Sequence, residues 1–430
     1  MFAGAILAAS LALTAAQSQQ IDAVVAQVMQ ADHVPGLSLG IAQNGRVLLA
    51  RGYGVRNAAG AHADAQTIYR IGSLTKQFTA ALVEIEADRG VLPLNVEIRG
   101  VSVAQMLSQT SGLVSYTDPG QTLDSALNAP TKFAPGTQWD YSNSNYYLLG
   151  TALQSATNQP YAQLLQRTIL RPLKLTATTF NLPFGNDVAV GSIHPGPNAA
   201  PMTAFAAGAL SSNVVDLLRW LNALQNGDVV PSDSFEQMTS SWALNDGTLT
   251  HYGFGFYVDN WYGWPIAQHN GLIDGFSSDD AISLDDGVDI VVLTNADKEP
   301  LAPLVKSIFA LVDKPKDANL VASLNQPPEN EDTSTTALAT KIATQIAAGT
   351  LDKSLLTTAY AGSLDEAVVS DWTAHLHPMG AIHLAEFLEL THLDDADYVK
   401  YRLTFDSGQV VMTLGLRGGK VNSIAFETPR

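Results

Sequence analysis

Apolar residues recur at helical spacing near the start of the chain. They lie three or four residues apart and predict a first amphipathic helix, whose apolar positions are Ile21, Val24, Val25, Val28 and Met29. Two strand-like runs come next, at residues 37–43 and 46–52, and Asn44-Gly45 joins them. Asn-Gly between such runs is a strong hairpin signal, because both turn residues adopt positive φ. The chain is therefore predicted to begin with a helix and a β-hairpin.

The middle of the chain is mostly helical, and strand character returns after it. A helix is predicted from Ser73 to about Gly90, where glycine suits a C-terminal cap, and helical patterns continue to about residue 224. Strand-like runs follow at residues 252–258, 266–269, 276–284 and 288–294, before a closing helix at 301–312. Early and late strands together predict one antiparallel sheet, with the first and closing helices on one face. The helical block forms a second lobe, so the fold class is α+β with a cleft where the lobes meet.

A second domain is predicted after a linker at residues 313–333, which contains Gln326-Pro327-Pro328-Glu329. Ser334 can cap a helix that runs to Ala347, and a short helix is expected at 354–361. Four strand-like runs then follow, at residues 382–390, 398–405, 409–416 and 420–426, the last three as a meander. Residues 21–312 and 334–430 are therefore predicted to be separate domains, the second a small α+β unit.

The N-terminus has features of an export signal. The first charged residue is Asp22, and a mostly apolar run at residues 2–16 ends in Thr14-Ala15-Ala16. This run is short for a membrane span and has small residues suited to cleavage after Ala16. Residues 1–20 are predicted to be a signal peptide that sends the protein to the periplasm or outside a bacterial cell; a buried apolar helix is the alternative. No other run approaches the length of a membrane span.

Composition narrows the classes of function. Hydrophobic residues make up 46% of the chain and charged residues 15%, which excludes an intrinsically disordered chain. The formal charge is −18 and no basic patch is visible, which argues against nucleic acid as a partner. The chain has no cysteine, so disulfides, thiolate catalysis and Cys-ligated metals are excluded.

Ser73 and Lys76 form the only Ser-x-x-Lys of the chain. Three residues apart in a first helical turn, they share one face. Desolvation and the positive end of the helix dipole would lower the pKa of Lys76, so a neutral amine can take the Ser73 proton. The Ser73 backbone N–H, at the helix N-terminus, suits a developing oxyanion. A serine cap beside a solvated lysine fits the same short pattern.

Two further motifs carry candidate chemistry. Tyr141-Ser142-Asn143 is the only Tyr-x-Asn, and a phenol near a lysine ammonium ionises more easily and can relay a proton. Asn143 can both donate to and accept from a substrate amide. His269-Asn270-Gly271 ends a predicted strand, where the imidazole can bond the tyrosine hydroxyl and glycine permits close approach of substrate. Taken singly, the second motif favours a buried tyrosine with a turn asparagine, and a strand-end histidine at a turn explains the third equally well.

Together, Ser73-x-x-Lys76, Tyr141-x-Asn143 and His269-x-Gly271 resemble the serine β-lactamase-like family over about residues 21–312. The similar branches are class C β-lactamases, D-alanyl-D-alanine carboxypeptidases and family VIII carboxylesterases. The resemblance implies a two-lobe hydrolase that forms an acyl-enzyme on an amide or ester substrate and needs no metal or other cofactor. It implies that Ser73 attacks, that Lys76 and Tyr141 share the general-base role, and that His269 assists Tyr141. The implied oxyanion hole is formed by the N–H groups of Ser73 and Leu272, and the implied substrate contacts are Asn143, Asn270 and Gly271.

The third motif departs from the Lys-Thr-Gly that the family often carries. His269 replaces a permanent cation and Asn270 replaces a small hydroxyl residue, so a substrate carboxylate loses an anchor. This favours a peptidase or esterase acting on a small molecule or peptide over an efficient β-lactamase. An inactive scaffold that binds cell-wall peptide or another protein is the rival hypothesis. Gln109 stands where relatives often have histidine and is interpreted as peripheral to catalysis.

The C-terminal segment carries weaker signals. Three histidines, His375, His377 and His383, match no metal-binding spacing and are interpreted as surface residues. The order of elements resembles the nuclear-transport-factor type of small domain. Capping of the cleft, dimerisation and neither role are all compatible with the sequence, which makes no prediction of oligomeric state.

Overall fold

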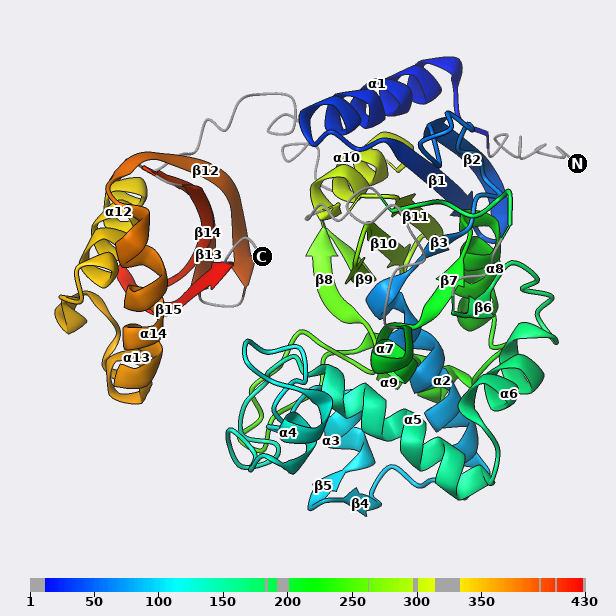
Figure 1. Cartoon of the computed structure of the whole chain (residues 1–430), viewed down its shortest axis with the longest axis horizontal. Helices are drawn as coiled ribbons and strands as arrows, with labels where there is room; N and C mark the ends of the chain where they lie inside the picture. The colour runs from blue at the N-terminus through cyan, green and yellow to red at the C-terminus, as the bar shows by residue number, and fades with distance from the viewer. Residues whose placement is uncertain are drawn as a thin grey trace, which may run out of the picture. The chain divides into compact units, whose positions relative to one another are not determined.

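The computed structural model describes residues 12–181, 185–191, 201–261, 263–296, 301–313, 333–393, 396–406 and 408–427. The chain divides into two compact units, Met1–Val321 (unit 1) and Ala322–Arg430 (unit 2), which are drawn in Figure 1. The division falls within the predicted linker at 313–333, of which residues 314–332 lie outside the described part of the chain.

Unit 1 is built around a six-stranded sheet with the order β2-β1-β11-β10-β9-β8, in which all neighbours are antiparallel. The strands are β1 (Gly36–Gln43), β2 (Arg46–Gly54), β8 (Tyr257–Trp261), β9 (Trp264–Ile273), β10 (Phe276–Ser283) and β11 (Val288–Thr294). The predicted sheet of early and late strands is confirmed. The strand expected at residues 252–258 is wrong in its start, because Gly255 has φ +85° and turns the chain before Tyr257.

Helices cover both faces of this sheet, which explains why β10 and β11 are buried along their whole length. On one face α1 (Ala15–Ala31) and α10 (Ala302–Val312) pack together, as predicted for the first and closing helices. On the other face α8 (Val214–Gln225) lies against β1 and β11 (Figure 1). Each fully buried Ile, Leu, Val or Phe side chain contributes about 1.5–3 kcal/mol.

The helical lobe surrounds α2, which is buried at eleven of its residues. Its helices are η1 (Gly72–Leu74), α2 (Thr75–Asp88), α3 (Val103–Leu107), α4 (Leu123–Asn128), α5 (Asn143–Thr157), α6 (Tyr161–Leu165), η2 (Gln166–Leu170), α7 (Pro201–Gly208) and α9 (Ser232–Thr239). Short strands β3 (Tyr69–Arg70), β6 (Thr179–Phe180) and β7 (Leu210–Ser212) form one small sheet, and β4 (Glu97–Ile98) pairs with β5 (Val101–Ser102). Strands of two or three residues leave no periodic signal, so the sequence did not predict them.

The N-terminal helix begins earlier than predicted. Thr14 caps α1, its hydroxyl accepting from the Gln17 N–H while the Gln17 side chain accepts from the Thr14 N–H. Gln17 also donates to the Leu311 carbonyl at 2.8 Å, which ties α1 to α10. Residues 1–11 of the predicted signal peptide lie outside the described residues, so export stays a prediction. No helix in the described part of the chain is long and apolar enough to cross a bilayer.

Unit 2 is an α+β unit with a four-stranded antiparallel sheet in the order β12-β13-β14-β15. Its elements are α12 (Thr333–Ala347), η3 (Lys353–Leu355), α13 (Thr358–Ser363), α14 (Glu366–Leu376), η4 (His377–Met379), β12 (Ile382–Leu393), β13 (Ala396–Phe405), β14 (Gly408–Arg417) and β15 (Lys420–Glu427). Alternate residues of β13 are buried against the helices, which confirms the predicted strand. The sequence missed α14, whose described side chains are mostly exposed and give little apolar periodicity.

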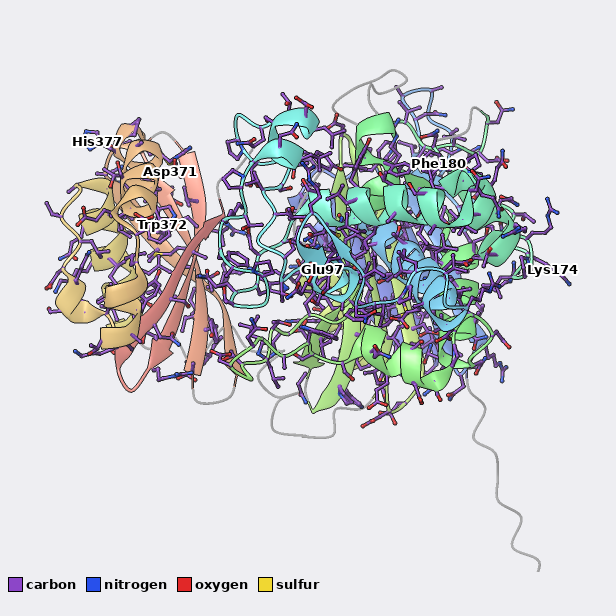
Figure 2. All side chains as sticks on the ribbon, turned by 90° about the horizontal axis from the view of Figure 1, so that it is seen from below. Glu97, Lys174, Phe180, Asp371, Trp372 and His377 are labelled. Atoms are coloured by element: carbon purple, nitrogen blue, oxygen red, sulfur yellow. The ribbon has the colours of Figure 1, made fainter. Side chains whose placement is uncertain are left out.

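The C-terminal histidines have different partners. His375 bonds the Asp371 carbonyl, His377 bonds the Ala347 carbonyl, and His383 bonds the Asp406 carboxylate. Asp371, Trp372 and His377 are labelled in Figure 2. Trp372 belongs to α14, and its ring packs edge-to-face on Phe426 with the centroids 5.5 Å apart. The described residues hold no group of three or more His, Asp or Glu side chains placed to bind a metal ion.

Three carboxylates are buried in the central sheet of unit 1, those of Asp279, Asp280 and Asp289, and burial raises the pKa of the last two. Burial raises the pKa of Asp280 to about 7, although the Gln77 amide donates to both of its oxygens at 2.7 and 2.9 Å. Burial raises the pKa of Asp289 to about 8 against the hydrogen bond from Gln225 at 2.7 Å. Asp289 Oδ2 has no hydrogen-bond partner among the described residues. Both groups therefore favour the protonated form in the folded state.

Replacement of Asp289 by Asn should stabilise the protein at alkaline pH. A raised pKa in the folded state means that Asp289 favours folding at low pH and loses that contribution as pH rises to about 8. Asp289→Asn is expected to raise the free energy of unfolding at pH 9 by at least about 1 kcal/mol, with a smaller difference near pH 5. Urea unfolding at both values measures this, with exposed Asp228→Asn as the control. An equal effect at both values would contradict the assignment.

Candidate active site

Ser73 lies in the single turn of η1, immediately before α2, and its side chain is partly exposed while its neighbours are buried. Gly72 makes the turn possible, because its φ is +47°. A Cβ on Gly72 would lie 3.1 Å from the Leu272 amide nitrogen, so only glycine lets η1 approach β9 this closely. The sequence predicted Ser73 in the first turn of the helix, and the structure places it in the 3₁₀ turn that precedes α2.

Lys76 is completely buried, and its amine contacts three oxygen atoms. Nζ lies 2.9 Å from Ser73 Oγ, 2.8 Å from Asn143 Oδ1 and 2.7 Å from the Ala207 carbonyl. Burial lowers the pKa of Lys76 well below its ordinary value, which favours the neutral amine. The two carbonyl oxygens can only accept, so they take the two N–H groups of a neutral amine. The remaining lone pair then points at Ser73, whose O–H donates to it.

The Ala207 carbonyl reaches Lys76 because α7 is kinked. Phe205 has φ +39° and ψ −131°, which interrupts the helix just before Ala206. The Ala206 carbonyl accepts from the Thr79 hydroxyl at 2.7 Å, and the next carbonyl accepts from Lys76. Sequence reasoning missed this contact because a main-chain acceptor has no residue type to mark it.

Tyr141 is half-buried at the site with its hydroxyl enclosed, and Lys76 Nζ lies over its ring, 4.8 Å from the centroid. The Ser73 hydroxyl is the one described hydrogen-bond partner of the Tyr141 hydroxyl. Burial raises the pKa of Tyr141 well above its ordinary value, although the nearby Ser73 hydroxyl acts in the opposite direction. The expected easier ionisation of Tyr141 is therefore not met, because desolvation favours the neutral forms of both groups. The resting pair is an amine and a phenol.

Asn143 is the first residue of α5, and both polar atoms of its side chain bond the protein. Oδ1 accepts from Lys76, and Nδ2 donates to Thr117 Oγ1 at 2.9 Å. Its backbone N–H donates to Ser115 Oγ at 3.1 Å, and Ser144 Oγ donates to the Val114 carbonyl. Residues 114–117 thus orient Asn143 towards Lys76. Nδ2 carries a second N–H group that these bonds do not use, so the predicted substrate contact stays a prediction.

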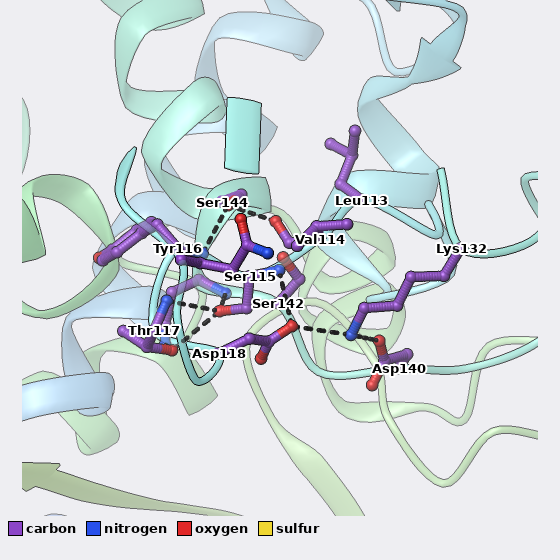
Figure 3. A network of polar contacts seen from close by, with 12 residues as sticks. Leu113, Val114, Ser115, Tyr116, Thr117, Asp118, Lys132, Asp140, Ser142 and Ser144 are labelled. Carbon is purple, nitrogen blue, oxygen red and sulfur yellow. Dashed lines mark hydrogen bonds and ion pairs between the residues drawn. The ribbon is translucent and has the colours of Figure 1, made fainter. Parts of the chain in front are cut away.

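An ion-pair network supports the same loop (Figure 3). Lys132 Nζ lies 2.9 Å from Asp118 and 2.7 Å from Asp140. Burial lowers the pKa of Lys132, but the hydrogen bonds to Asp140 and Asp118 outweigh it and raise the pKa. Lys132 therefore connects the end of the 114–118 loop to the residue before Tyr141.

His269 bonds a tyrosine that the sequence did not single out. Nδ1 lies 2.6 Å from the Asn270 carbonyl, which can only accept, so Nδ1 carries the proton. Nε2 therefore accepts from the Tyr252 hydroxyl at 3.0 Å. The expected partner was Tyr141, whose ring centroid lies 6.0 Å from that of His269. Burial, the largest cause, lowers the pKa of His269 to about 3, so the imidazole is neutral.

The end of β9 packs directly against η1. A Cβ on Gly271 would lie 2.3 Å from the Ile71 carbonyl and 3.1 Å from the Ser73 amide nitrogen. Ser278 Oγ of β10 donates to the Ile71 carbonyl at 2.8 Å and fixes the turn to the sheet. The backbone amides of Ser73 and Leu272 thus both lie where β9 meets η1, as an oxyanion hole requires. Asn270 lies opposite Asp279 in the sheet, and its predicted contact with substrate stays a prediction.

Residues 21–310 match the family model described as Beta-lactamase. The chain belongs to the beta-lactamase family. It is a serine hydrolase of the beta-lactamase fold, with the antiparallel sheet and helical lobe described above.

Several known proteins are similar to this chain. Protein flp of Staphylococcus aureus (strain COL) is 27% identical over 356 residues, which are 73% of this chain and 70% of that protein. A D-stereospecific amidohydrolase from Streptomyces sp. has a TM-score of 0.58 and 26% identity, over 69% of this chain and 98% of that one. An octameric penicillin-binding protein homologue from Pyrococcus abyssi has a TM-score of 0.61 and 21% identity, over 95% and 98% of the two chains, which shows the shared fold.

The pH dependence of kcat/KM should follow Lys76 and not His269. Catalysis needs the neutral amine, so activity rises with pH as Lys76 loses its proton, below the ordinary range of a lysine pKa. His269 is already neutral above about pH 3, so His269→Gln is expected to lower the rate about tenfold by displacing its neighbours, without moving the acid limb.

Profiles of kcat/KM against pH for the wild type, His269→Gln and Tyr252→Phe measure this. The three acid limbs are expected to coincide. A limb near about pH 6.5, the ordinary histidine value, that disappears only in His269→Gln would assign the titration to His269 instead.

Proposed function

We propose that this protein hydrolyses the amide bond of small peptides or amino acid amides through an acyl-enzyme on Ser73. The observation that carries the proposal is the fully buried amine of Lys76, whose Nζ lies 2.9 Å from Ser73 Oγ, 2.8 Å from Asn143 Oδ1 and 2.7 Å from the Ala207 carbonyl. A neutral amine held in this way is a base already in contact with its nucleophile.

The reaction begins when Ser73 Oγ attacks the carbonyl carbon and its proton moves to Lys76 Nζ. The backbone N–H groups of Ser73 and Leu272 stabilise the negative oxygen of the tetrahedral intermediate. The intermediate collapses, the C–N bond breaks, and Tyr141 passes a proton to the leaving amine and regains one from Lys76. A water molecule then attacks the ester carbonyl, and Ser73 is released with its proton restored.

The third motif favours a substrate without a carboxylate beside the scissile bond. His269 is neutral and its Nε2 accepts from Tyr252, so it offers no cation to a substrate anion. Penicillins and peptides with a free C-terminal carboxylate lack this partner, which argues against efficient β-lactamase and carboxypeptidase action. The similarity to a D-stereospecific amidohydrolase supports an amide substrate, and a D-configured acyl group in particular.

Covalent labelling tests the nucleophile. A fluorophosphonate probe is expected to add its mass once, at Ser73, and Ser73→Ala should abolish labelling. Lys76→Met should slow labelling at least about 100-fold while the protein stays folded, because the base is lost and the serine remains. Peptide mapping by mass spectrometry locates the adduct. Labelling that persists in Ser73→Ala would refute the assignment.

A substrate panel tests the reaction class. Four compounds separate the alternatives: a D-amino acid amide, a peptide ending in D-Ala-D-Ala, nitrocefin and a short p-nitrophenyl ester. The D-amino acid amide is expected to have a kcat/KM at least about tenfold above nitrocefin and the D-Ala-D-Ala peptide, because both of these carry a carboxylate. The ester reports active enzyme whatever the specificity. Faster turnover of nitrocefin would make the protein a β-lactamase.

A further inference from the structure

We propose that Gln109 is a positioning residue, which holds the main chain on both sides of Tyr141 and thereby places the phenol for proton transfer. The proposal rests on the amide hydrolysis proposed above. It revises the interpretation of Gln109 as peripheral to catalysis, and it assigns a task to a side chain that touches neither Ser73 nor Lys76 in any contact of the described residues.

Gln109 bonds both residues that flank Tyr141. Its backbone carbonyl accepts from the Asp140 N–H at 3.0 Å, and its side-chain Oε1 accepts from the Ser142 N–H at 3.0 Å. Gln109 thus bonds the main chain at the residue before Tyr141 and at the residue after it. No other described residue has both of these bonds.

The side chain of Gln109 is itself fixed by hydrogen bonds to α5. Oε1 of Gln109 also accepts from Asn145 Nδ2 at 2.6 Å, and Asn145 Oδ1 accepts from Ser111 Oγ at 2.6 Å. Asn145 belongs to the first turn of α5, so the side chain of Gln109 is fixed to the helix that carries Asn143. The amide is completely buried, where water does not compete for these bonds.

The backbone of Gln109 adopts an unfavourable conformation to do this. Its φ is +62°, a left-handed value that costs a residue other than glycine about 1 kcal/mol or more. Its Nε2 has no hydrogen-bond partner among the described residues, a second cost in a buried position. Strain and an unpaired donor persist only where the surroundings enforce them, and here they accompany the two bonds to residues 140 and 142.

Tyr141 depends on this support because the one described partner of its hydroxyl, Ser73, is itself a reacting group. Apart from this contact, the position of the phenol oxygen follows from ring packing and from the course of the main chain. Proton transfer to a leaving amine requires an oxygen within hydrogen-bond reach of it. A displacement of about 1 Å costs about 100-fold in rate.

The test separates positioning from mere stability by using one substitution at two glutamines. Gln109→Met keeps the volume of the side chain and removes the acceptor. Gln105→Met is the matched control, because Gln105 accepts from the Ser102 N–H in the capping box of α3 and has no hydrogen bond to residues 140–143 among the described contacts. Gln109→Glu keeps the acceptor oxygen and loses no donated bond, since Nε2 has no partner.

We expect Gln109→Met to lower kcat for the amide substrate by about 10- to 100-fold, with KM within about threefold of the wild type. Gln109→Glu should recover most of this loss. Gln105→Met should lower the thermal unfolding midpoint by a few degrees, about the cost of a lost cap, with kcat unchanged. Thermal midpoints of all variants confirm that each is folded at the assay temperature. Gln109→Asn, one methylene shorter, replaces Gln109→Met if the latter is unfolded, with the same expected loss of kcat.

The outcomes distinguish this inference from the function on which it rests. A wild type that neither labels at Ser73 nor hydrolyses any amide or ester overturns the proposed function and this inference with it. A wild type that does both, with Gln109→Met equal to Gln105→Met in kcat, overturns the positioning role alone. A rise in KM at constant kcat also overturns it, because Gln109 would then act on substrate binding.

Discussion

The structure of unit 1 depends on a lysine amine that is removed from water. Burial makes the charged form of Lys76 costly, and the neutral form has only two N–H groups to donate. Asn143 and the Ala207 carbonyl take both, from α5 and from the kinked end of α7. What remains is a lone pair directed at Ser73. Three segments far apart in the sequence must therefore pack together before the serine has a base.

The same burial sets the character of the neighbouring groups. Tyr141 stays a phenol and His269 stays a neutral imidazole, because no charged partner compensates the loss of water around either ring. The site is thus an uncharged polar centre inside an aromatic wall that includes Tyr252 and Tyr257. A neutral site accelerates a reaction most when charge develops only in the transition state. Here the backbone N–H groups near Ser73 would stabilise that charge.

Two segments of the chain fix the position of the Tyr141 phenol: the loop at residues 114–118 and the segment that contains Gln109. The loop at residues 114–118 orients Asn143, and Lys132 ties that loop to Asp140 through two ion pairs. Gln109 holds the main chain on both sides of Tyr141, because it accepts hydrogen bonds from the N–H groups of Asp140 and Ser142. Polar contacts to the main chain thus fix a side chain whose hydroxyl lies beside that of Ser73.

The sequence by itself determined the large elements and the motifs, because both depend on local information. Periodicity predicted β1, β11, α1 and α10, and the fixed spacing within each motif marked Ser73, Lys76, Tyr141, Asn143 and His269. Tertiary structure alone decided that Tyr252 bonds His269, that Ala207 accepts from Lys76 and that Gln109 supports Tyr141. These three contacts depend on burial and on main-chain acceptors. Both arise only when distant segments pack together, so the order of residue types along the chain cannot predict them.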